Sequence, residues 1–215
     1  MHIDSFIFRD RKDAGIQLAE ALLKLGIKTE MVLAIPRGGV PLGVIVAEEL
    51  GIPLKLYLVR KIGHPSNDEY AIGAVTENHL LLNQSEKPDS IFLTASIQKE
   101  RERIREMKEK FGHVATPNDI IGKKIILVDD GIATGTCVLL AIQEIRKSGA
   151  KEIIVASPVC PLKTEDKIRH IADRLIILKH PGQFTGIGAY FSDFSQLTDN
   201  QVIALIKKSP KKVTQ

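Results

Sequence analysis

Five short apolar runs recur along the chain, and most are separated by segments whose apolar residues are spaced three or four positions apart. The runs are MVLAI (31–35), LKLYLVR (54–60), KKIILVD (123–129), EIIVASP (152–158) and RLIIL (174–178). A continuous apolar run of this length predicts a strand buried on both faces, as in parallel sheets. The intervening segments predict helices over 13–25, 44–50, 138–147 and 163–172. The pattern therefore predicts an α/β fold with a Rossmann-like, open, mainly parallel five-stranded sheet and helices on both faces.

Residues 61–120 interrupt this alternation. Gly, Pro, Ser and Asn gather in 61–70, which predicts a flexible loop. Residues 71–75 and 80–82 are short β candidates that can pair as a hairpin. Residues 92–111 carry dense charges of both signs around one apolar stripe, which is typical of an exposed helix. The stripe can pack against the rest of the chain or against a second copy, so a homodimer is one expectation.

The C-terminal part has a different character. Residues 180–197, named the hood here, are loop-like and aromatic. A last helix is expected to begin at Thr198, because a threonine followed three residues later by glutamine forms a capping box. We expect one domain over 1–206 and a basic, disordered tail over 207–215.

Composition is consistent with one globular domain. The chain has 215 residues, of which 44% are hydrophobic and 26% charged, enough for one sizeable core. No apolar run approaches the roughly 20 residues that a bilayer crossing needs, and the first residues lack the apolar stretch of a secretory signal. Cys137 and Cys160 show no metal-ligand spacing and are expected to be buried, reduced thiols. A cytoplasmic protein without a membrane partner is expected.

The net charge of +4 does not indicate nucleic-acid binding. The excess equals the four lysines of the C-terminal end, Lys207, Lys208, Lys211 and Lys212, so the body of the chain is neutral overall. A short lysine-rich end is typical of a solubilising tail. We therefore expect no nucleic-acid partner.

The stretch IILVDDGIATGT, residues 125–136, ends a predicted strand on two adjacent carboxylates. In open α/β sheets, ligands bind where the carboxyl ends of the strands meet loops and helix starts. Asp129 and Asp130 can serve one ligand if the chain turns there, and Gly131 favours that turn. The small residues 133–136 then offer amides and hydroxyls at a helix start, which favours an anion. The segment can therefore bind a diol and a phosphate, as in a ribose 5-phosphate; capping of the helix or metal binding by the acids are the alternatives.

This stretch resembles the phosphoribosyl pyrophosphate (PRPP) signature of type I phosphoribosyltransferases, which PRPP synthetases and non-catalytic regulators share in part. The resemblance implies that Asp129 and Asp130 hold the ribose hydroxyls. It also implies that the following turn wraps the 5-phosphate and completes the PRPP site. The residues of that turn are Gly131, Ile132, Ala133, Thr134, Gly135 and Thr136.

Two further segments are similar to the same family. AIPRGG (34–39) resembles the family's pyrophosphate loop, in which Arg37, Gly38 and Gly39 would bind pyrophosphate. Taken alone, it is also consistent with a tight turn and a solvent-facing arginine. Arg60 and Lys61 begin a segment that resembles the mobile catalytic loop, which implies that both neutralise the departing pyrophosphate. Alone, two basic residues at the start of a loop carry little information.

A more particular resemblance is to a small group of bacterial proteins known only as predicted phosphoribosyltransferases. Its hallmarks are similar to FRDR (8–11), AIPRGGVPLG (34–43), AIGAV (71–75), VDDGIATG (128–135) and YFSDFS (190–195). The resemblance implies PRPP-dependent transfer of a phosphoribosyl group to a nitrogen acceptor, with release of pyrophosphate. It implies no particular acceptor.

The family also implies Mg²⁺, held largely by PRPP and water, with Asp129 or Asp130 in contact through water; no site formed by protein ligands alone is expected. Transferases acting on 6-oxopurines carry an aspartate where this chain has Ala133, which disfavours that substrate class and leaves orotate-like, adenine-like and other nucleophiles open. The hood would then supply the acceptor pocket through aromatic rings that stack on a base. The candidate rings are Phe184, Tyr190, Phe191 and Phe194; the alternative is that these aromatics form local core.

Two other functions are alternatives to a transferase. A PRPP- or nucleotide-sensing regulator would keep the fold and most ligand contacts without chemistry. The neutral body of the chain argues against a regulator that binds RNA. An unrelated phosphohydrolase or NTPase is disfavoured, because the P-loop pattern G-x-x-x-x-G-K-[ST] is missing from the sequence. A transferase that uses PRPP remains the favoured interpretation.

Overall fold

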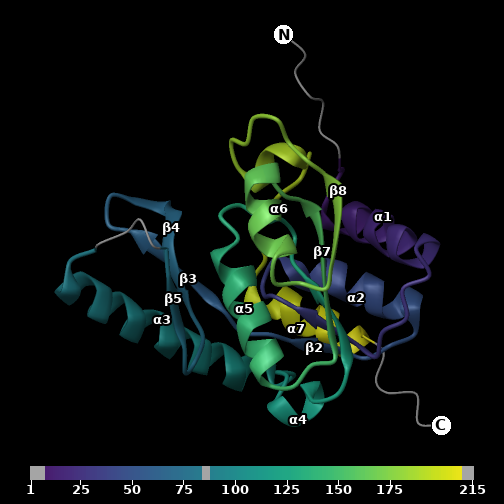
Figure 1. Cartoon of the computed structure of the whole chain (residues 1–215), viewed down its shortest axis with the longest axis horizontal. Coiled ribbons are helices and arrows are strands. Elements are labelled where there is room, and N and C mark those ends of the chain that lie inside the picture. The colour runs from purple at the N-terminus through teal and green to yellow at the C-terminus, as the bar shows by residue number, and fades with distance from the viewer. Residues whose placement is uncertain (1–7, 84–87, 210–215) are drawn as a thin grey trace.

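The protein is built around one parallel sheet, flanked by helices (Figure 1). A computed structural model describes residues 8–83 and 88–209. The strands, in spatial order, are β2 (Leu54–Leu56), β1 (Met31–Ala34), β6 (Lys124–Val128), β7 (Glu152–Val159) and β8 (Arg174–Lys179). All four pairings between them are parallel. The predicted α/β fold is confirmed, although β2 ends at Leu56 and not at residue 60.

Four strands of this sheet, β1, β6, β7 and β8, contribute to two cores, whereas β2 contributes to one. On β1, Val32 and Ala34 face one hydrophobic cluster, whereas Met31 and Leu33 face the other. Adjacent strand residues point to opposite faces, so a sheet covered on both sides needs continuous apolar runs. The helices on one side are α1 (Arg11–Lys24), α2 (Gly39–Leu50) and α7 (Asp199–Lys208); those on the other are α5 (Thr136–Lys147) and α6 (Leu162–Arg169).

A second, antiparallel sheet lies beside α5, which separates it from the main sheet (Figure 1). Its strands are β3 (Arg60–His64), β4 (Asn67–Val75) and β5 (Leu80–Leu82). The hairpin expected from 71–75 and 80–82 is confirmed. The loop predicted for 61–70 is wrong, because that segment forms two strands joined by a turn at 65–66. The turn-forming residues of the segment serve that tight turn and an irregular register near Gly63.

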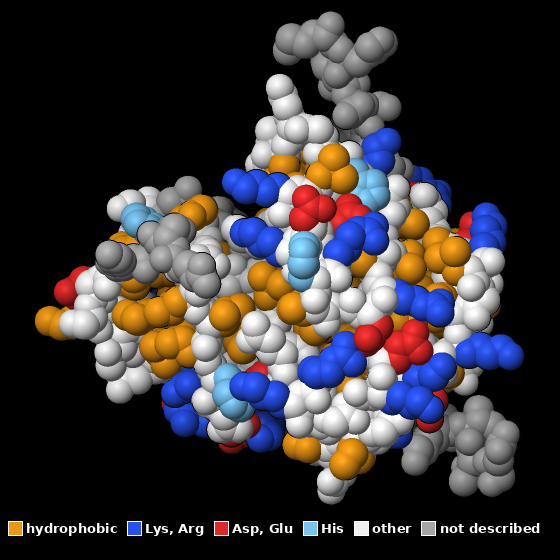
Figure 2. Space-filling model, in the orientation of Figure 1, with side chains coloured by type: hydrophobic (Ala, Val, Ile, Leu, Met, Phe, Trp, Pro, Cys, Tyr) orange, Lys and Arg blue, Asp and Glu red, His pale blue; other side chains and the backbone are white. Residues whose placement is uncertain are grey.

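The long charged helix α3 (Ser90–Phe111) packs against its own chain. Its apolar stripe places Ile104, Met107 and Phe111 in the same core as α1 and α2, beside β3 and α7. Its first turn is exposed, and Ile91 has 80% of its surface accessible. Figure 2 shows hydrophobic side chains gathering over the region of β3–β5 and α3, while Lys, Arg, Asp and Glu intermingle over the rest of that face.

The remaining elements are a short helix before β6, a 3₁₀ helix in the hood, and the C-terminal helix α7. α4 (Pro117–Ile120) and the 3₁₀ helix η1 (Ile187–Tyr190), which lies in the hood, were not expected from the sequence. Thr198 caps α7 with the predicted capping box to Gln201. Lys207 and Lys208 belong to α7, so the tail prediction is wrong for them; residues 210–215 lie outside the described residues. Of the helices formed by residues 8–83 and 88–209, none combines the length and apolar character that crossing a membrane requires.

Candidate functional site

The acid pair lies at the carboxyl end of β6, as the sequence predicted. The backbone N–H of Asp130 donates to Oδ1 of Asp129 over 2.9 Å, which shows that the chain turns directly after the strand. Gly131 follows, and a Cβ at this position would lie 2.2 Å from Cγ2 of Ile187 in the hood. Only glycine therefore allows the hood to pack this closely over the acids.

The turn between β6 and α5 is held by neighbouring elements. Gly135 adopts a left-handed conformation with φ of 78°, immediately before α5 begins. The hydroxyl of Thr164 donates to the carbonyl of Ala133 over 2.7 Å. The hydroxyl of Thr136 lies 3.1 Å from that of Thr134 and donates to Oδ1 of Asn83, also over 3.1 Å. These contacts preorganise a turn whose amides and hydroxyls suit an anion.

The acids and this turn line one cavity of about 330 Å³. Arg60 and Lys61, at the start of β3, line the same cavity. So do Pro36 and Gly38 from the loop after β1, and Ile187 from the hood. The cavity thus brings together Gly38, the basic pair 60–61 and residues 129–136, which were predicted from three separate parts of the chain, whereas the predicted Arg37 and Gly39 do not line it.

A second cavity of about 270 Å³ adjoins the first. The two share Gly38, Arg60, Asp130 and Ile187. The second cavity is lined in addition by two arginines and by apolar hood residues, namely Arg11, Arg37, Phe194 and Leu197. Positive side chains on one side of Asp130 and an amide-rich turn on the other give room for two separate anionic groups.

The two glycines after Arg37 have different roles. A Cβ at position 38 would lie 2.1 Å from Oδ2 of Asp130. The carboxylate therefore occupies space that any side chain at position 38 would fill. Gly39 lines neither cavity. Its N–H donates to the carbonyl of Ile35 over 3.0 Å, and a Cβ there would lie 2.7 Å from the carbonyl oxygen of Val128. Gly39 thus allows close packing against β6. Its N–H is bonded to the carbonyl of Ile35 and is not available to a ligand.

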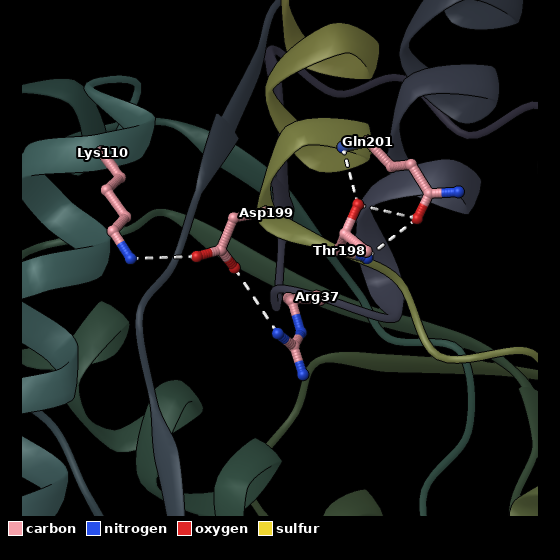
Figure 3. A network of polar contacts seen from close by, with 5 residues as sticks. All are labelled: Arg37, Lys110, Thr198, Asp199 and Gln201. Atoms are coloured by element: carbon pink, nitrogen blue, oxygen red, sulfur yellow. Dashed lines mark hydrogen bonds and ion pairs between the residues drawn. The ribbon is translucent and has the colours of Figure 1, made fainter.

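Arg37 contacts Asp199, the first residue of α7 (Figure 3). Its Nη1 lies 3.5 Å from Oδ1 of Asp199, and the side chain is 43% exposed. Lys110 contacts the other oxygen of Asp199 over 3.2 Å. An exposed ion pair at this distance contributes little energy. Arg37 lines the second cavity without entering the first, and the peptide bond before it is cis.

Arg60 is oriented by α3. Its Nε donates to Oε2 of Glu100 over 2.8 Å, and Glu100 is buried with 7% of its surface exposed. Arg103 contacts the other oxygen of Glu100 over 2.5 Å. The charged helix therefore fixes the direction of a basic side chain that lines both cavities.

The negative charges of Asp129 and Asp130 are destabilised by burial. Burial raises the pKa of Asp129 well above its ordinary value, and the neighbouring charge of Asp130 raises it further. Burial also raises the pKa of Asp130, but the Arg11 guanidinium, 2.7 Å from Oδ2, opposes the shift. Two carboxylates that lack full compensation favour a ligand offering hydroxyl donors or a cation.

Two side chains at the site were missed by sequence reasoning. Arg11 belongs to the FRDR segment, which the sequence singled out without giving it a role. Asn83 follows β5, at the end of an ordinary apolar run. Neither position carried a local signal, because each reaches the site only through tertiary contacts.

The hood aromatics predicted to form an acceptor pocket are mostly core. Tyr190 and Phe191 are buried, with 6% and 2% of their surfaces exposed. The ring of Phe184 stacks on that of Tyr190 with centroids 6.2 Å apart, and the hydroxyl of Tyr190 donates to the carbonyl of Gln183 over 2.9 Å. None of the three lines either cavity at the acids. The observed arrangement matches the alternative, in which these rings form local core.

A larger cavity of about 500 Å³ lies away from the acids, between α3, the turn after β4 and the C-terminal half of α5. Most of its charged side chains have partners within it: Lys108 contacts Glu77 over 2.7 Å, and Glu144 contacts His79 and accepts from the hydroxyl of Tyr57. Size alone therefore does not identify the functional site. The smaller cavities, at the carboxyl ends of β1 and β6, hold the incompletely compensated charges.

Cys137 lines the first cavity but is a poor nucleophile. Burial, with the Asp129 charge, raises its pKa to about 12, so little thiolate exists near neutral pH. Within residues 8–83 and 88–209, no group of three or more His, Cys, Asp or Glu side chains is placed to hold a metal ion.

Comparison with known proteins decides the family. A family model described as the phosphoribosyl transferase domain matches residues 8–192, most of the chain. The chain belongs to this family. The resemblance to type I phosphoribosyltransferases is thereby confirmed at the level of the family.

Similar proteins agree with this assignment. Rv0571c of Mycobacterium tuberculosis (strain H37Rv), which carries a provisional phosphoribosyl transferase name, is 34% identical over 208 residues, covering 94% of the chain and 47% of the relative. The amidophosphoribosyltransferase of Rhizobium etli is 30% identical over 155 residues, covering 71% of the chain and 25% of the relative. The chain thus spans about half the length, or less, of these curated relatives.

A solved structure supports the fold over nearly the whole chain. The crystal structure of TT1426 from Thermus thermophilus shares 35% sequence identity and superposes with a TM-score of 0.76. The match covers 95% of this chain and 99% of that one. The five-stranded sheet with helices on both faces is therefore shared by the two proteins.

Proposed function

We propose that the protein transfers the 5-phosphoribosyl group of PRPP to a nitrogen acceptor and releases pyrophosphate. The observation that carries the proposal is the pair of adjoining cavities on either side of Asp130. One contains an amide-rich turn at a helix start, and the other is lined by three arginines. PRPP has anions of two kinds, a 5-phosphate and a pyrophosphate, separated by a ribose that carries a diol.

Each part of PRPP has matching residues. Asp129 and Asp130 accept hydrogen bonds from the ribose hydroxyls. The turn from Gly131 to Thr136 surrounds the 5-phosphate, with α5 contributing its positive N-terminal end. Arg37 and Arg60 bind the pyrophosphate from the second cavity, and Lys61 reaches it from the first. Gly38 allows close approach, whereas Gly39 acts through packing.

The chemistry then needs electrostatics and positioning from this chain. The bond between ribose C1 and the pyrophosphate oxygen breaks with its electron pair on the leaving group, while the acceptor nitrogen forms a bond to C1 and releases its proton to water. Arg37, Arg60 and Lys61 stabilise the charge that develops on pyrophosphate. The acids hold the ring so that C1 faces the acceptor.

The residues of this site could contact Mg²⁺ through water but could not hold it without PRPP. Two incompletely compensated carboxylates border the first cavity, and Mg²⁺ typically combines one or two carboxylates with phosphate oxygens and water. Asp129 and Asp130 would contact it through water. When bound, the ion would neutralise part of the pyrophosphate charge.

The acceptor is best sought where the first cavity is apolar. Ile35, Val59 and Ile187 line it, together with Ala71 of β4. Ala133 stands where 6-oxopurine transferases carry an aspartate, so that class remains disfavoured. We expect a cytoplasmic protein whose small-molecule partners are PRPP and this acceptor.

The test is pyrophosphate release from PRPP and Mg²⁺ across a panel of nucleobases and small amines. Release with at least one acceptor, abolished by the double variant Asp129→Asn and Asp130→Asn, supports transfer. Asp166→Asn on α6, an exposed carboxylate away from the cavities, is the matched control. Tight PRPP binding without release for any acceptor would instead favour a sensing regulator on the same fold.

A further inference from the structure

Two sequence segments without an assigned function, FRDR (8–11) and YFSDFS (190–195), lie side by side. The N–H of Phe8 donates to the carbonyl of Tyr190 over 3.1 Å, and the N–H of Ser192 donates back to the carbonyl of Phe8 over 2.9 Å. The rings of Phe8 and Phe191 pack with centroids 5.3 Å apart. The start of the described chain is therefore joined to the hood.

The first segment also determines where α1 begins. Asp10 is its N-cap, and the carboxylate of Asp10 accepts from the N–H of Asp13 over 2.8 Å. Such a cap fixes the first turn of a helix. Arg11 is the first residue of α1, and its side chain is 12% exposed.

Arg11 makes three contacts at the site. Its Nε donates to Oδ2 of Asp130 over 2.7 Å, and its Nη1 donates to the carbonyl of Ser195 over 2.8 Å. The guanidinium carbon lies 3.8 Å from the centre of the Phe194 ring. A planar guanidinium can donate in two directions while its face rests on an aromatic ring, which a lysine ammonium cannot do.

Asp130 is thereby confined from two sides. Arg11 holds Oδ2, and the missing side chain of Gly38 leaves just enough space for the carboxylate: a Cβ there would lie 2.1 Å from Oδ2 and 2.5 Å from Oδ1. An ion pair as buried as this one constrains geometry more than an exposed pair does. The orientation of Asp130 thus depends on Arg11, and through Arg11 on the hood.

We propose that Arg11 is a positioning residue that holds Asp130 in the orientation needed to bind the ribose hydroxyls, and that it joins this acid to the hood. The inference rests on the proposed function, because it assumes that Asp130 binds the sugar of PRPP. It gives the segments 8–11 and 190–195 one shared role: the first contains Arg11, and the second contacts the Arg11 guanidinium through Ser195 and Phe194.

The experiment is a double-mutant cycle read by calorimetric titration with ribose 5-phosphate, which contains the sugar and the 5-phosphate but no pyrophosphate. Arg11→Gln and Asp130→Asn are each expected to weaken binding by about tenfold or more. The double variant should bind no more weakly than Asp130→Asn alone, because Arg11 acts through Asp130. Arg9→Gln is the matched control, since the Arg9 side chain is 83% exposed.

A second ligand separates positioning from direct binding. Arg11 also lines the cavity proposed for pyrophosphate. Because the hydrogen bonds of Arg11 go to Asp130 and Ser195, Arg11→Gln should weaken the binding of inorganic pyrophosphate by a smaller factor than that of ribose 5-phosphate; an equal or larger loss for pyrophosphate would contradict positioning. A loss confined to pyrophosphate, or independent effects that multiply in the double variant, would overturn the inference.

Two further variants keep the test decisive if Arg11→Gln does not fold. Arg11→Lys keeps the charge and should still weaken ribose 5-phosphate binding. Millimolar guanidinium should restore binding to Arg11→Ala but not to Asp130→Asn; unchanged binding in Arg11→Lys, or no rescue, contradicts the inference.

If the wild type binds neither ribose 5-phosphate nor PRPP, the proposed function itself fails. If the wild type binds and only Asp130→Asn weakens binding, the role of Arg11 alone fails.

Discussion

Gly38 and Asp130 approach each other so closely that no side chain can be accommodated at position 38. A Cβ there would lie 2.1 Å from Oδ2 of Asp130. The loop after β1 and the acid pair after β6 are therefore one structural unit, although they are far apart in the sequence.

Gly38→Ala should displace the Asp130 carboxylate. We expect the free energy of unfolding to fall by about 1–3 kcal/mol, as for other overpacked sites. PRPP affinity should fall by at least about tenfold, since a bond to a charged group is lost. Chemical denaturation and calorimetric titration measure the two effects. Gly182→Ala is the control, because a Cβ at 182 would meet nothing within 4 Å; equal behaviour of the two variants would contradict the account.

Asp129→Asn should stabilise the ligand-free protein while removing sugar binding. Burial, with the neighbouring Asp130 charge, raises the pKa of Asp129, so its ionised form costs folding energy at neutral pH. The neutral amide should raise the free energy of unfolding by roughly 1 kcal/mol. The gain should vanish below the ordinary carboxyl pKa of about 4, where Asp129 is protonated in both states. Urea unfolding at neutral and acid pH tests the sign; destabilisation at neutral pH would refute it.

Asp199→Asn should release Arg37 for ligand binding. The ion pair is long, at 3.5 Å, and Arg37 is 43% exposed, so breaking it costs little. We expect unchanged or tighter pyrophosphate binding in Asp199→Asn, and binding weakened by about tenfold in Arg37→Ala. Lys110→Ala, which removes the other partner of Asp199, is the control and should leave pyrophosphate binding unchanged. Weaker binding in Asp199→Asn would show that the observed pair is part of the binding geometry.

Acid should weaken the link between β2 and α4. Burial alone would raise the pKa of Asp119, but hydrogen bonds from Lys55 and Thr116 together lower it to about 2. The stabilisation is therefore present above the unfolded carboxyl pKa and is lost as pH falls toward 2. Because the pair is partly exposed, Asp119→Asn should cost at most about 1 kcal/mol at neutral pH. Denaturation of both proteins across acid pH should show the difference closing.

The sequence was sufficient for the sheet and for placing the acid pair at the end of β6. Continuous apolar runs such as KKIILVD, alternating with helical patterns, indicate strands covered on both faces, and such strands present ligand sites at their carboxyl ends. That placement made Asp129 and Asp130 candidates for ligand binding, whereas their proposed role as sugar ligands came from the family resemblance. The hairpin formed by β4 and β5 could also be predicted, because 71–75 and 80–82 are short apolar segments.

Contacts between distant segments could not be predicted in the same way. Arg9 and Arg11 look alike in the sequence, yet one is 83% exposed and the other pairs with an acid 119 residues away. Tyr190 and Phe191 were assigned to a pocket, because an aromatic side chain suits a base and a core equally well. Lys61 lies in a strand, since pairing with Ala74 overrides the turn-forming residues that follow it.

The central claim is that the end of β6 binds the sugar of PRPP. Calorimetric titration of PRPP with Mg²⁺ into the wild type and into the double variant Asp129→Asn, Asp130→Asn tests it most directly. The account predicts saturable binding to the wild type, and loss of that binding in a variant that remains folded. Wild-type protein that binds no PRPP, or a folded double variant that binds it equally well, would contradict the account.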